Sequence, residues 1–389
     1  MKILQNGVAK NMKFYDIIIT EEGMSIIDDV NIIRTFPFVK GSFIDVCNNN
    51  INFWAKDLNK TKKQHHTWIG YNNKNKKAEY YNFNFLNNTN IMHELYQGSN
   101  RPRYYSPSFN YSTLNTNFIT VVNTPVIKDN KEYMASKIIE FCKNGEILFE
   151  WSTLEHLSEL ELFLEQMLIQ RDENGFVVNQ TNFIACNGVC KIPKNNLNDE
   201  RFKEGNYLVS ERALGMIFIV DKDTKKVVWK IAGNDLNYHS SHYAHMIPAG
   251  LKGEGNILFY NNGLMYSPTS SIIEFNPITL EKIFEYESEE IKSAFRGSVQ
   301  KTVKGTYIVC AAEQGRLIEI DKNKNIIRDL KLSKPEFSGT DPNRYHDYNL
   351  IHRNLLSFYR MEQIPDEWIG DLLKDNLFEK SIKDLDTSL

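Results

Sequence analysis

The sequence predicts an all-β fold, and this expectation rests on a recurring unit and on the turns within it. Each unit begins at a Gly or Asn turn, continues as a short β-rich run, and ends with two further runs across a tight polar turn. Two β-branched runs joined in this way are typical of a hairpin. Repeated four-stranded units with insertions in their loops are typical of a β-propeller, although the irregular spacing leaves the number of blades open. The unit occupies residues 117–151, 205–229, 255–286 and 305–330.

The rest of the chain extends this organisation. The segment before residue 100 is also strand-rich, as in FYDIIIT and SFIDVC, but it is less regular. Leucines that recur at intervals of three and four predict a helical insertion over residues 154–170. Helical spacing returns from residue 366, where we expect a tail that packs under the last strand unit or frays. No low-complexity linker interrupts the chain, so we expect a propeller domain over 1–365 and a helical tail over 366–389.

The composition excludes two classes of protein. The 389 residues carry 46 Lys and Arg against 49 Asp and Glu, a net charge of −3, which excludes a strongly basic nucleic-acid-binding protein. No apolar run approaches the ~18 residues that a membrane span requires. We therefore expect neither nucleic acid nor a membrane as a partner. The polar N-terminus has no signal-peptide pattern, and we expect a cytoplasmic protein.

The cysteines agree with a reducing compartment. Their number is odd and they are scattered, which favours free thiols over a disulfide framework. Two of them form a C-x-x-x-C pair, but a zinc site normally needs a second pair or histidines at set spacing. Packed thiols are therefore the favoured interpretation. The five are Cys47, Cys142, Cys186, Cys190 and Cys310.

Polar residues near the start of inner strands are the first candidates for a site, because inner strands of a propeller face its channel. Asn187 lies in the otherwise apolar run TNFIACNGVCKI, where a turn or bulge is the alternative interpretation. Arg212 follows a strand-forming run beside Glu211. A surface salt bridge is the alternative there, whereas an inward guanidinium would suit a sulfate, phosphate or carboxylate.

The run HSSHYAHM concentrates three histidines, His239, His242 and His245, at intervals of three. On a strand, His242 faces away from the other two, so a three-histidine metal site would need a contorted loop. One histidine acting as a nucleophile or as an acid or base is the more plausible role. We expect no metal and no cofactor.

Four motifs in the second half of the chain occur in a characteristic order. They are GNYLVSERALGMIFIVDKDTKKVVWKIAG, WKIAGNDLNYHSSHYAHMIP with GNILFYNNG, FRGSVQKTVKGTYIVCAAEQGRLIEID, and LSFYRMEQIPDEW. Together they resemble bacterial arylsulfate sulfotransferases over residues 137–368. The resemblance implies a six-bladed propeller that moves a sulfuryl group between phenolic compounds, by a ping-pong reaction through a sulfohistidine. It also implies a small aryl sulfate or phenol as the substrate.

The resemblance assigns roles residue by residue. The nucleophilic histidine of the family falls on His242 and its sulfate-holding arginine on Arg212. Asn187 matches the Asn of an H-x-N pair whose histidine is replaced by Ala185. Residues 104–116, which match the place of a further family histidine, contain none.

These departures predict a diverged active site. Its catalytic residues are His242 and Arg212, and Asn187 binds the sulfate. Losing a positioned acid or base typically costs 10²–10⁴-fold in rate. His239, His245 and Arg296 are the candidates that compensate by binding substrate or sulfate. The alternative interpretation is a non-catalytic propeller that binds an anionic ligand or a protein partner.

Overall fold

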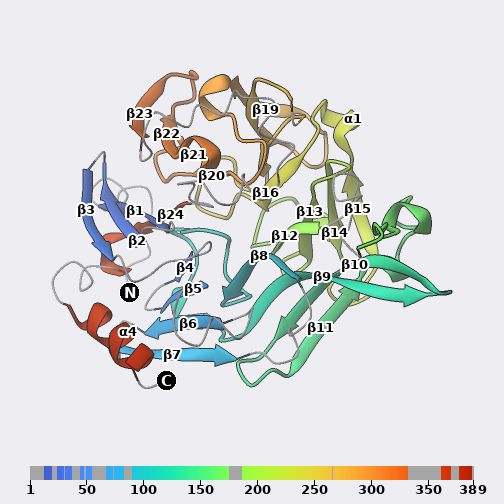
Figure 1. The fold of residues 1–389 in the computed structure, drawn as a ribbon. Helices are drawn as coiled ribbons and strands as arrows, with labels where there is room; N and C mark the ends of the chain where they lie inside the picture. The colour runs from blue at the N-terminus through green and yellow to red at the C-terminus, as the bar shows by residue number, and fades with distance from the viewer. Residues whose placement is uncertain are drawn as a thin grey trace.

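The described residues of the computed structural model form six four-stranded antiparallel sheets with short helical turns between them. Figure 1 shows the sheets following one another around a common centre. The all-β class predicted from the sequence is confirmed. The described residues are 13–19, 24–29, 31–36, 44–47, 50–54, 67–72, 74–82, 90–174, 186–264, 266–331, 361–368 and 376–387.

The first three sheets come from the N-terminal half of the chain, with one strand supplied by the C-terminal end. The first has the order β24 (Met361–Pro365), β1 (Phe14–Ile19), β2 (Met24–Asp28) and β3 (Asn31–Phe36). The second has β4 (Ile44–Cys47), β5 (Asn50–Trp54), β6 (Thr67–Asn72) and β7 (Lys77–Asn82). The third has β8 (Asn90–Gln97), β9 (Phe118–Lys128), β10 (Lys131–Phe141) and β11 (Ile147–Ser152).

The other three sheets contain the remaining predicted repeat units, so all four units are confirmed as strands. The fourth sheet has β12 (Cys186–Lys191), β13 (Tyr207–Glu211), β14 (Met216–Val220) and β15 (Val227–Ile231). The fifth has β16 (Ser241–Met246), β17 (Ile257–Asn261), β18 (Ser270–Phe275) and β19 (Lys282–Ser288). The sixth has β20 (Ser298–Lys301), β21 (Tyr307–Ala311), β22 (Arg316–Ile320) and β23 (Ile326–Lys331).

Short helical elements lie outside the sheets. In the described part of the chain they include the α-helices α1 (Gly233–Leu236) and α4 (Leu377–Thr387). The 3₁₀ turns are η3 (Tyr111–Thr113), η4 (Thr153–Glu155), η5 (Leu164–Met167), η7 (Glu200–Phe202), η8 (Glu289–Ile291) and η9 (Ala312–Gln314).

One edge strand of every sheet contacts the corresponding strand of the next sheet. Strand β24 contacts β4, β4 contacts β8, β8 contacts β12, β12 contacts β16, and β16 contacts β20. Gln300 of β20 joins β24 directly, since its Nε2 donates to the Met361 carbonyl at 3.2 Å and its Oε1 accepts from the Gln363 N–H at 3.1 Å. These six strands are therefore the inner strands of the molecule.

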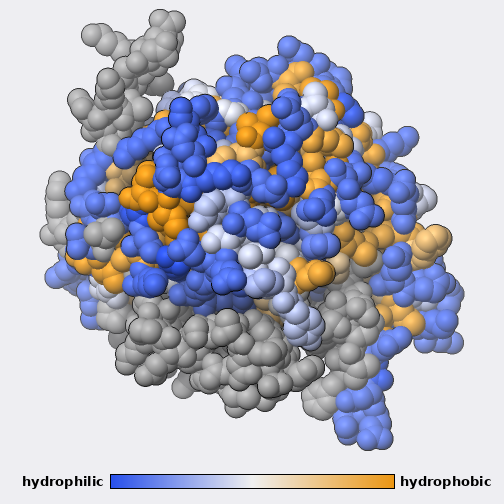
Figure 2. All heavy atoms as spheres, turned by 90° about the horizontal axis from the view of Figure 1, so that it is seen from above, coloured by the Kyte–Doolittle hydropathy of each residue, from blue (hydrophilic) through white to orange (hydrophobic). Residues whose placement is uncertain are grey.

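The hydrophobic core lies between successive sheets, because each buried cluster takes side chains from two of them. Ile138 of β10 shares a cluster with Val209 of β13, and Ile217 of β14 shares one with Phe259 of β17. Seen from above (Figure 2), the described surface is mainly hydrophilic with separate hydrophobic patches. Apolar side chains are thus buried on both faces of the strands. This burial stabilises many short strands in a chain of ordinary composition.

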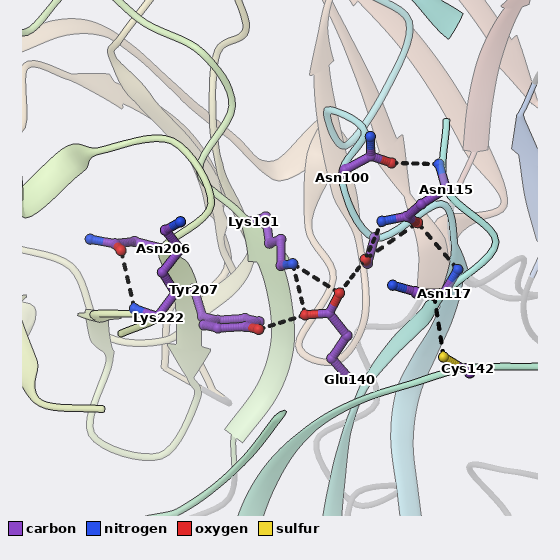
Figure 3. Close-up of polar contacts among 10 residues, drawn as sticks. Asn100, Asn115, Asn117, Glu140, Cys142, Lys191, Asn206, Tyr207 and Lys222 are labelled. Atoms are coloured by element: carbon purple, nitrogen blue, oxygen red, sulfur yellow. Dashed lines mark hydrogen bonds and ion pairs between the residues drawn. The ribbon is translucent and has the colours of Figure 1, made fainter. Parts of the chain in front are cut away.

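Two buried carboxylates each connect one sheet to the next, and we call these clusters interblade locks. In the first, Figure 3 shows Glu140 of β10 receiving Lys191 and Tyr207 from the following sheet, at 2.7 and 2.5 Å. In the second, Glu274 of β18 receives Lys301 at 2.7 Å and Tyr307 at 2.6 Å. Both locks therefore use the same residue types at the same places in successive sheets.

The helix predicted over residues 154–170 is wrong. The segment consists of η4, η5 and turns, and Glu161 has a left-handed φ of 57° that an α-helix does not accommodate. Leu160 and Leu162 are buried against Trp151 in the core. Farther along, the Ile169 N–H bonds the Glu132 carbonyl beside β10 at 2.8 Å. The leucine spacing thus reflects packing against the sheet and not helical turns.

The helical tail is confirmed over α4, but its predicted position under the last strand unit is wrong. Helix α4 contacts β7, and the buried Phe378 meets Phe36 and Tyr71 with ring centroids at 5.0 and 4.7 Å. It therefore covers parts of the first and second sheets, because Phe378 packs against β3 of the one and β6 of the other. Within the described part of the chain, no helix has the length and apolar character needed to cross a membrane.

The connection between β8 and β9, residues 98–117, crosses several inner strands. Arg103 donates to the Val189 carbonyl of β12 at 3.1 Å, and Tyr104 packs edge-on against His245 of β16 at 4.9 Å. Ser106 donates to the carbonyl of Ala249, beyond the C-terminal end of β16, at 2.7 Å. The connection therefore covers the end of β16 that lies away from His242.

Candidate active site

Strand β16 is interrupted by a bulge between His242 and His245. His242 pairs with Tyr260 and His245 pairs with Leu258, so three steps on β16 oppose two steps on β17. Within the bulge, Tyr243 has a φ of 58°, which is uncommon for a residue other than Gly and is frequent at functional sites. Its phenol accepts from Gln300 Nε2 at 3.1 Å, and the Arg103 guanidinium lies 4.2 Å over its ring. These contacts hold the strained residue in place.

His242 is buried, with 3% of its surface exposed. Its Nδ1 lies 2.7 Å from the Gly297 carbonyl oxygen. Because a carbonyl can only accept, Nδ1 carries a hydrogen, and this bond places the lone pair of a neutral imidazole on Nε2. The protein thus holds His242 in the tautomer that a nucleophile or a base requires.

Arg212 lies immediately after β13 and meets the same loop. Its Nη2 donates to the Ala294 carbonyl at 3.2 Å, and its guanidinium lies 4.4 Å over the Phe295 ring. The carboxylate of the neighbouring Glu211 accepts the backbone N–H groups of Ala213 and Leu214, both at 2.8 Å. Residues 293–297, which precede β20, therefore hold both Arg212 and His242.

Asn187 forms a bulge in β12, as its alternative interpretation predicted. Its amide is also buried and oriented toward the histidine strand. Oδ1 accepts from Ser210 at 2.7 Å, and Nδ2 donates to the Ser241 carbonyl, one residue before His242, at 3.0 Å. An amide nitrogen has a second hydrogen, and in the described part of the chain no acceptor is recorded for it.

Charged groups around the 293–297 segment are mostly positive. Lys292 donates to the carbonyls of Asn262 and Leu264, both at 3.1 Å, and burial together with the charge of Arg212 lowers its pKa, against the opposing effect of Glu313. Burial raises the pKa of Glu313, while backbone N–H groups and the charges of Arg296 and Lys292 oppose that rise. Lys292, Arg212 and Arg296 outnumber the partly buried Glu313 carboxylate beside this segment, which favours an anionic ligand.

Of the other predicted site residues, Arg296 lies in the 293–297 segment, whereas His239 and His245 lie outside it. Arg296 belongs to the 293–297 segment, has a φ of 64°, and its carbonyl accepts from Asn262 Nδ2 at 2.7 Å. His239 is exposed in the loop before β16. His245 is fully buried, donates from Nδ1 to the Tyr243 carbonyl at 2.8 Å, and packs against Tyr104. The three histidines therefore occupy three different environments, and within the described ranges no group of three or more His, Cys, Asp and Glu could hold a metal ion.

Two residues of this region were missed by the sequence analysis. Lys292 and Glu313 are single charged residues beside strand ends, and their spacing carries no motif. Lys292 is revealed only by its bonds to the Asn262 and Leu264 carbonyls, and Glu313 only by its bonds to the N–H groups of Ala294 and Phe295. Ala185, the residue that replaces a family histidine, lies outside the described residues. Cys142, Cys186, Cys190 and Cys310 are free thiols.

The burial of His245 predicts a specific acid sensitivity. Burial lowers the pKa of His245 from 6.5 to about 3, so the unfolded chain binds this proton more readily than the folded protein does. The folded protein should therefore lose about 1.4 kcal/mol of stability per pH unit below 6.5, until pH 3. His245→Phe should flatten this dependence in urea unfolding between pH 6.5 and 5. His239→Phe, which changes an exposed ring, is the control, and an unchanged slope in His245→Phe would contradict the assignment.

Comparison with known proteins decides the family. A family model described as Arylsulfotransferase (ASST) matches residues 112–332, which is more than half of the chain.

The chain belongs to the arylsulfotransferase family.

The family resemblance predicted from the motifs is thus confirmed, and all the predicted site residues lie within the matched range. Membership supports an arylsulfotransferase-like function and, at the same coarse level, aryl sulfates or phenols as substrates. A search of curated proteins found no match.

Several solved structures resemble this arylsulfotransferase-family chain at 12% sequence identity or less. A protein of unknown function from Bacteroides caccae is 12% identical, with a TM-score of 0.46 over 90% of this chain and 99% of its own. The Dos1 propeller is 10% identical, with a TM-score of 0.40 over 76% of this chain and 74% of its own. The β-propeller domain of Cps50 (Swd1) from Myceliophteria thermophila is 8% identical, with a TM-score of 0.39 over 86% and 89%.

Proposed function

We propose that this chain is an enzyme that transfers a sulfuryl group between phenolic compounds, with His242 as the nucleophile. The observation that carries the proposal is the loop of residues 293–297, whose carbonyls bind both His242 and Arg212. One short loop thereby fixes a histidine with its lone pair on Nε2 and a guanidinium suited to sulfuryl oxygens. Family membership supports the same reaction class.

We also propose that residues 1–365 form one closed propeller whose blades are the six sheets. The contacts between successive inner strands support this arrangement, as do the bonds from Gln300 to β24. Strand β24 pairs with β1 from the other end of the chain, and such pairing would fasten the ring. In this arrangement His242 and Asn187 lie on neighbouring inner strands, at the end opposite to the 98–117 connection.

In the first half-reaction, Nε2 of His242 attacks the sulfur of an aryl sulfate. The N–S bond forms as the bond between sulfur and the aryl oxygen breaks, and the phenolate leaves with the electron pair. The ring becomes a cation, and its Nδ1–H keeps donating to the Gly297 carbonyl, which stabilises the sulfohistidine. In the second half-reaction an acceptor phenol gives up its proton to water, its oxygen attacks sulfur, and the N–S bond breaks with its electron pair returning to Nε2, which restores neutral His242.

Positioning and charge stabilisation supply most of the catalysis in this proposal, since transfer through a loose transition state leaves little covalent work for the protein. Arg212 binds two sulfuryl oxygens, and the second amide hydrogen of Asn187 donates to the third. The charges of Lys292 and Arg296 add a favourable potential for the anion. Burial of His242 strengthens each of these interactions by lowering the local dielectric.

The site is diverged where a phenol must gain or lose its proton. His245 stays neutral in the core, so it cannot serve as the acid at neutral pH. Donors whose phenolate leaves without protonation should therefore be used best. Aryl sulfates with electron-withdrawing substituents are expected to react faster than phenyl sulfate.

A labelling experiment tests the covalent step. The protein is incubated with an aryl [³⁵S]sulfate without acceptor, digested, and searched for an acid-labile label on the peptide that contains His242. Label on this peptide that disappears when a phenol is added supports the enzyme. Sulfate binding without any label would instead favour the non-catalytic, anion-binding propeller.

Arg212→Lys should lower kcat/KM by about 10²-fold, because an ammonium cannot hold two sulfuryl oxygens at once. Its loss also removes the planar group that lies over Phe295. The measurement is steady-state release of nitrophenol from 4-nitrophenyl sulfate at several donor concentrations. Lys292→Arg, which preserves charge beside the same loop, is the matched comparison. Equal kinetics for wild type and Arg212→Lys would contradict the role given to Arg212.

A further inference from the structure

The 293–297 segment contains the carbonyls on which the proposed site depends, yet it has no regular secondary structure of its own. Its conformation is set from two sides. On one side, Asn262 Nδ2 donates to the Ser293 carbonyl and to the Arg296 carbonyl, both at 2.7 Å. On the other side lies η9, the 3₁₀ turn that follows β21. The segment is therefore held between the ends of two neighbouring sheets.

Glu313 of η9 supplies the bonds on that second side. Its carboxylate accepts the Ala294 N–H at 2.5 Å and also bonds the N–H of Phe295. Its own N–H donates to Ser293 Oγ at 3.3 Å, and that hydroxyl donates to the Phe295 carbonyl at 2.5 Å. A carboxylate that accepts two successive backbone N–H groups fixes the peptide planes between them.

Those peptide planes orient the two carbonyls that serve the site. The Ala294 carbonyl accepts from Arg212, and the Gly297 carbonyl accepts from His242 Nδ1. The Phe295 ring, whose N–H Glu313 also holds, lies under the Arg212 guanidinium. Both of these contacts to Arg212 come from residues whose backbone N–H groups bond Glu313. The contact to His242 comes from the same short segment.

We propose that Glu313 is a positioning residue for sulfuryl transfer, which fixes the 293–297 segment so that His242 keeps its hydrogen on Nδ1 and Arg212 keeps its orientation. This inference rests on the proposed function for its effect on rate, but its effect on His242 does not require turnover. In this proposal Glu313 contacts neither Nε2 of His242 nor the sulfur that is transferred. Its role is to keep the nucleophilic tautomer populated and the guanidinium aligned before substrate arrives.

The kinetic test compares Glu313→Ala and Glu313→Gln with Glu319→Gln. Glu319 is the matched control, because it lies in the same sheet and bonds Thr306 at the other end of β21. Glu313→Ala should lower kcat by about 10²-fold, the typical cost of a misplaced reacting group. Glu313→Gln keeps an acceptor oxygen and should lose only several-fold. Glu319→Gln should match wild type.

The spectroscopic test uses the protein at rest, labelled with ¹⁵N-histidine. The Nδ1–H resonance of His242, identified by its absence from His242→Gln, should be present and slow to exchange in wild type and in Glu319→Gln. It should exchange faster in Glu313→Gln and disappear in Glu313→Ala. If wild type transfers no sulfuryl group, the proposed function fails, whereas this resonance still tests Glu313.

The inference is overturned if Glu313→Ala is folded and equals Glu319→Gln in both kcat and the His242 resonance. If Glu313→Ala does not fold, Glu313→Gln takes its place in this comparison. Loss of stability alone, with kcat and the resonance unchanged, would show that Glu313 serves only the fold.

Discussion

His242→Ala should abolish sulfuryl transfer, lowering kcat by on the order of 10⁴-fold or more, as loss of a nucleophile does in other covalent enzymes. The variant removes the only atom to which the proposed reaction binds sulfur. The protein should remain folded, since the bulge that carries His242 is also held by the bond between Gln300 and the Tyr243 phenol. Far-ultraviolet circular dichroism and thermal unfolding verify the fold.

The measurement is nitrophenol release from 4-nitrophenyl sulfate with a panel of phenols as acceptors. In wild type, release should depend on the acceptor, because the sulfohistidine must be discharged before the next turnover. Added imidazole should restore part of the activity of His242→Ala by entering the space that the ring leaves. Undiminished release from His242→Ala would overturn the mechanism. Sulfate binding by a wild type that shows no release would point to a non-catalytic propeller.

The fold was predictable where local sequence determines local structure. The four repeat units could be predicted because each hairpin needs alternating side chains and a polar turn, and both features are visible in a short stretch of sequence. The helix predicted around Leu160 and Leu162 was wrong because apolar spacing alone does not distinguish a helix from a looped segment that packs on a sheet. The left-handed Glu161 between them has no distinctive sequence signal. The position of α4 depends on Phe378 meeting Phe36 and Tyr71, three residues from distant parts of the chain.

Part of the candidate site could likewise be predicted from local sequence, and part could not. His242 and Arg212 were predicted because they stand in motifs whose order matches a known family, and Asn187 because it matches the Asn of the family's H-x-N pair. Glu313 was missed because its role lies in the N–H groups of residues 293–297 and not in its neighbours along the chain. The sequence analysis expected His242 to face away from His245, but it did not predict the bulge that lies between them.

Glu274→Ala should lower the free energy of unfolding by about 3–5 kcal/mol, the cost of removing one partner from a buried ion pair. Glu274 and Lys301 are 1% and 4% exposed, so the remaining ammonium would have little access to water. Burial lowers the pKa of Lys301, and the Glu274 carboxylate opposes that effect. The Tyr307 hydroxyl would lose its acceptor as well. Urea unfolding measures the change, and a loss below about 1 kcal/mol would contradict it.

The chain itself contains an apolar version of this interblade lock. Strand register shows which residues correspond. Ile219 takes the place of Glu274, because each lies opposite a leucine of the neighbouring strand, Leu208 or Leu258. Met246 and Ile257 take the places of Lys301 and Tyr307, because each of these two pairs faces across the first two strands of its sheet. Where the first sheet of a pair carries Glu, the next supplies Lys and Tyr. Where it carries Ile, the next supplies Met and Ile. The residue that faces the first position changes too, since Phe284 lies opposite Glu274 and Trp229 lies opposite Ile219.

This correspondence defines a fourfold exchange that separates charge from packing. Phe284 stacks on Tyr307 with ring centroids 4.1 Å apart, so removing the tyrosine alone would leave a void. Glu274→Ile, Phe284→Trp, Lys301→Met and Tyr307→Ile together copy the apolar set. The combination should unfold within about 1 kcal/mol of wild type or at higher urea, because well-packed apolar residues commonly replace a buried ion pair without loss. A combination as unstable as Glu274→Ala would show that the backbone of this sheet pair accepts only the charged set, and that the two kinds of lock are not interchangeable.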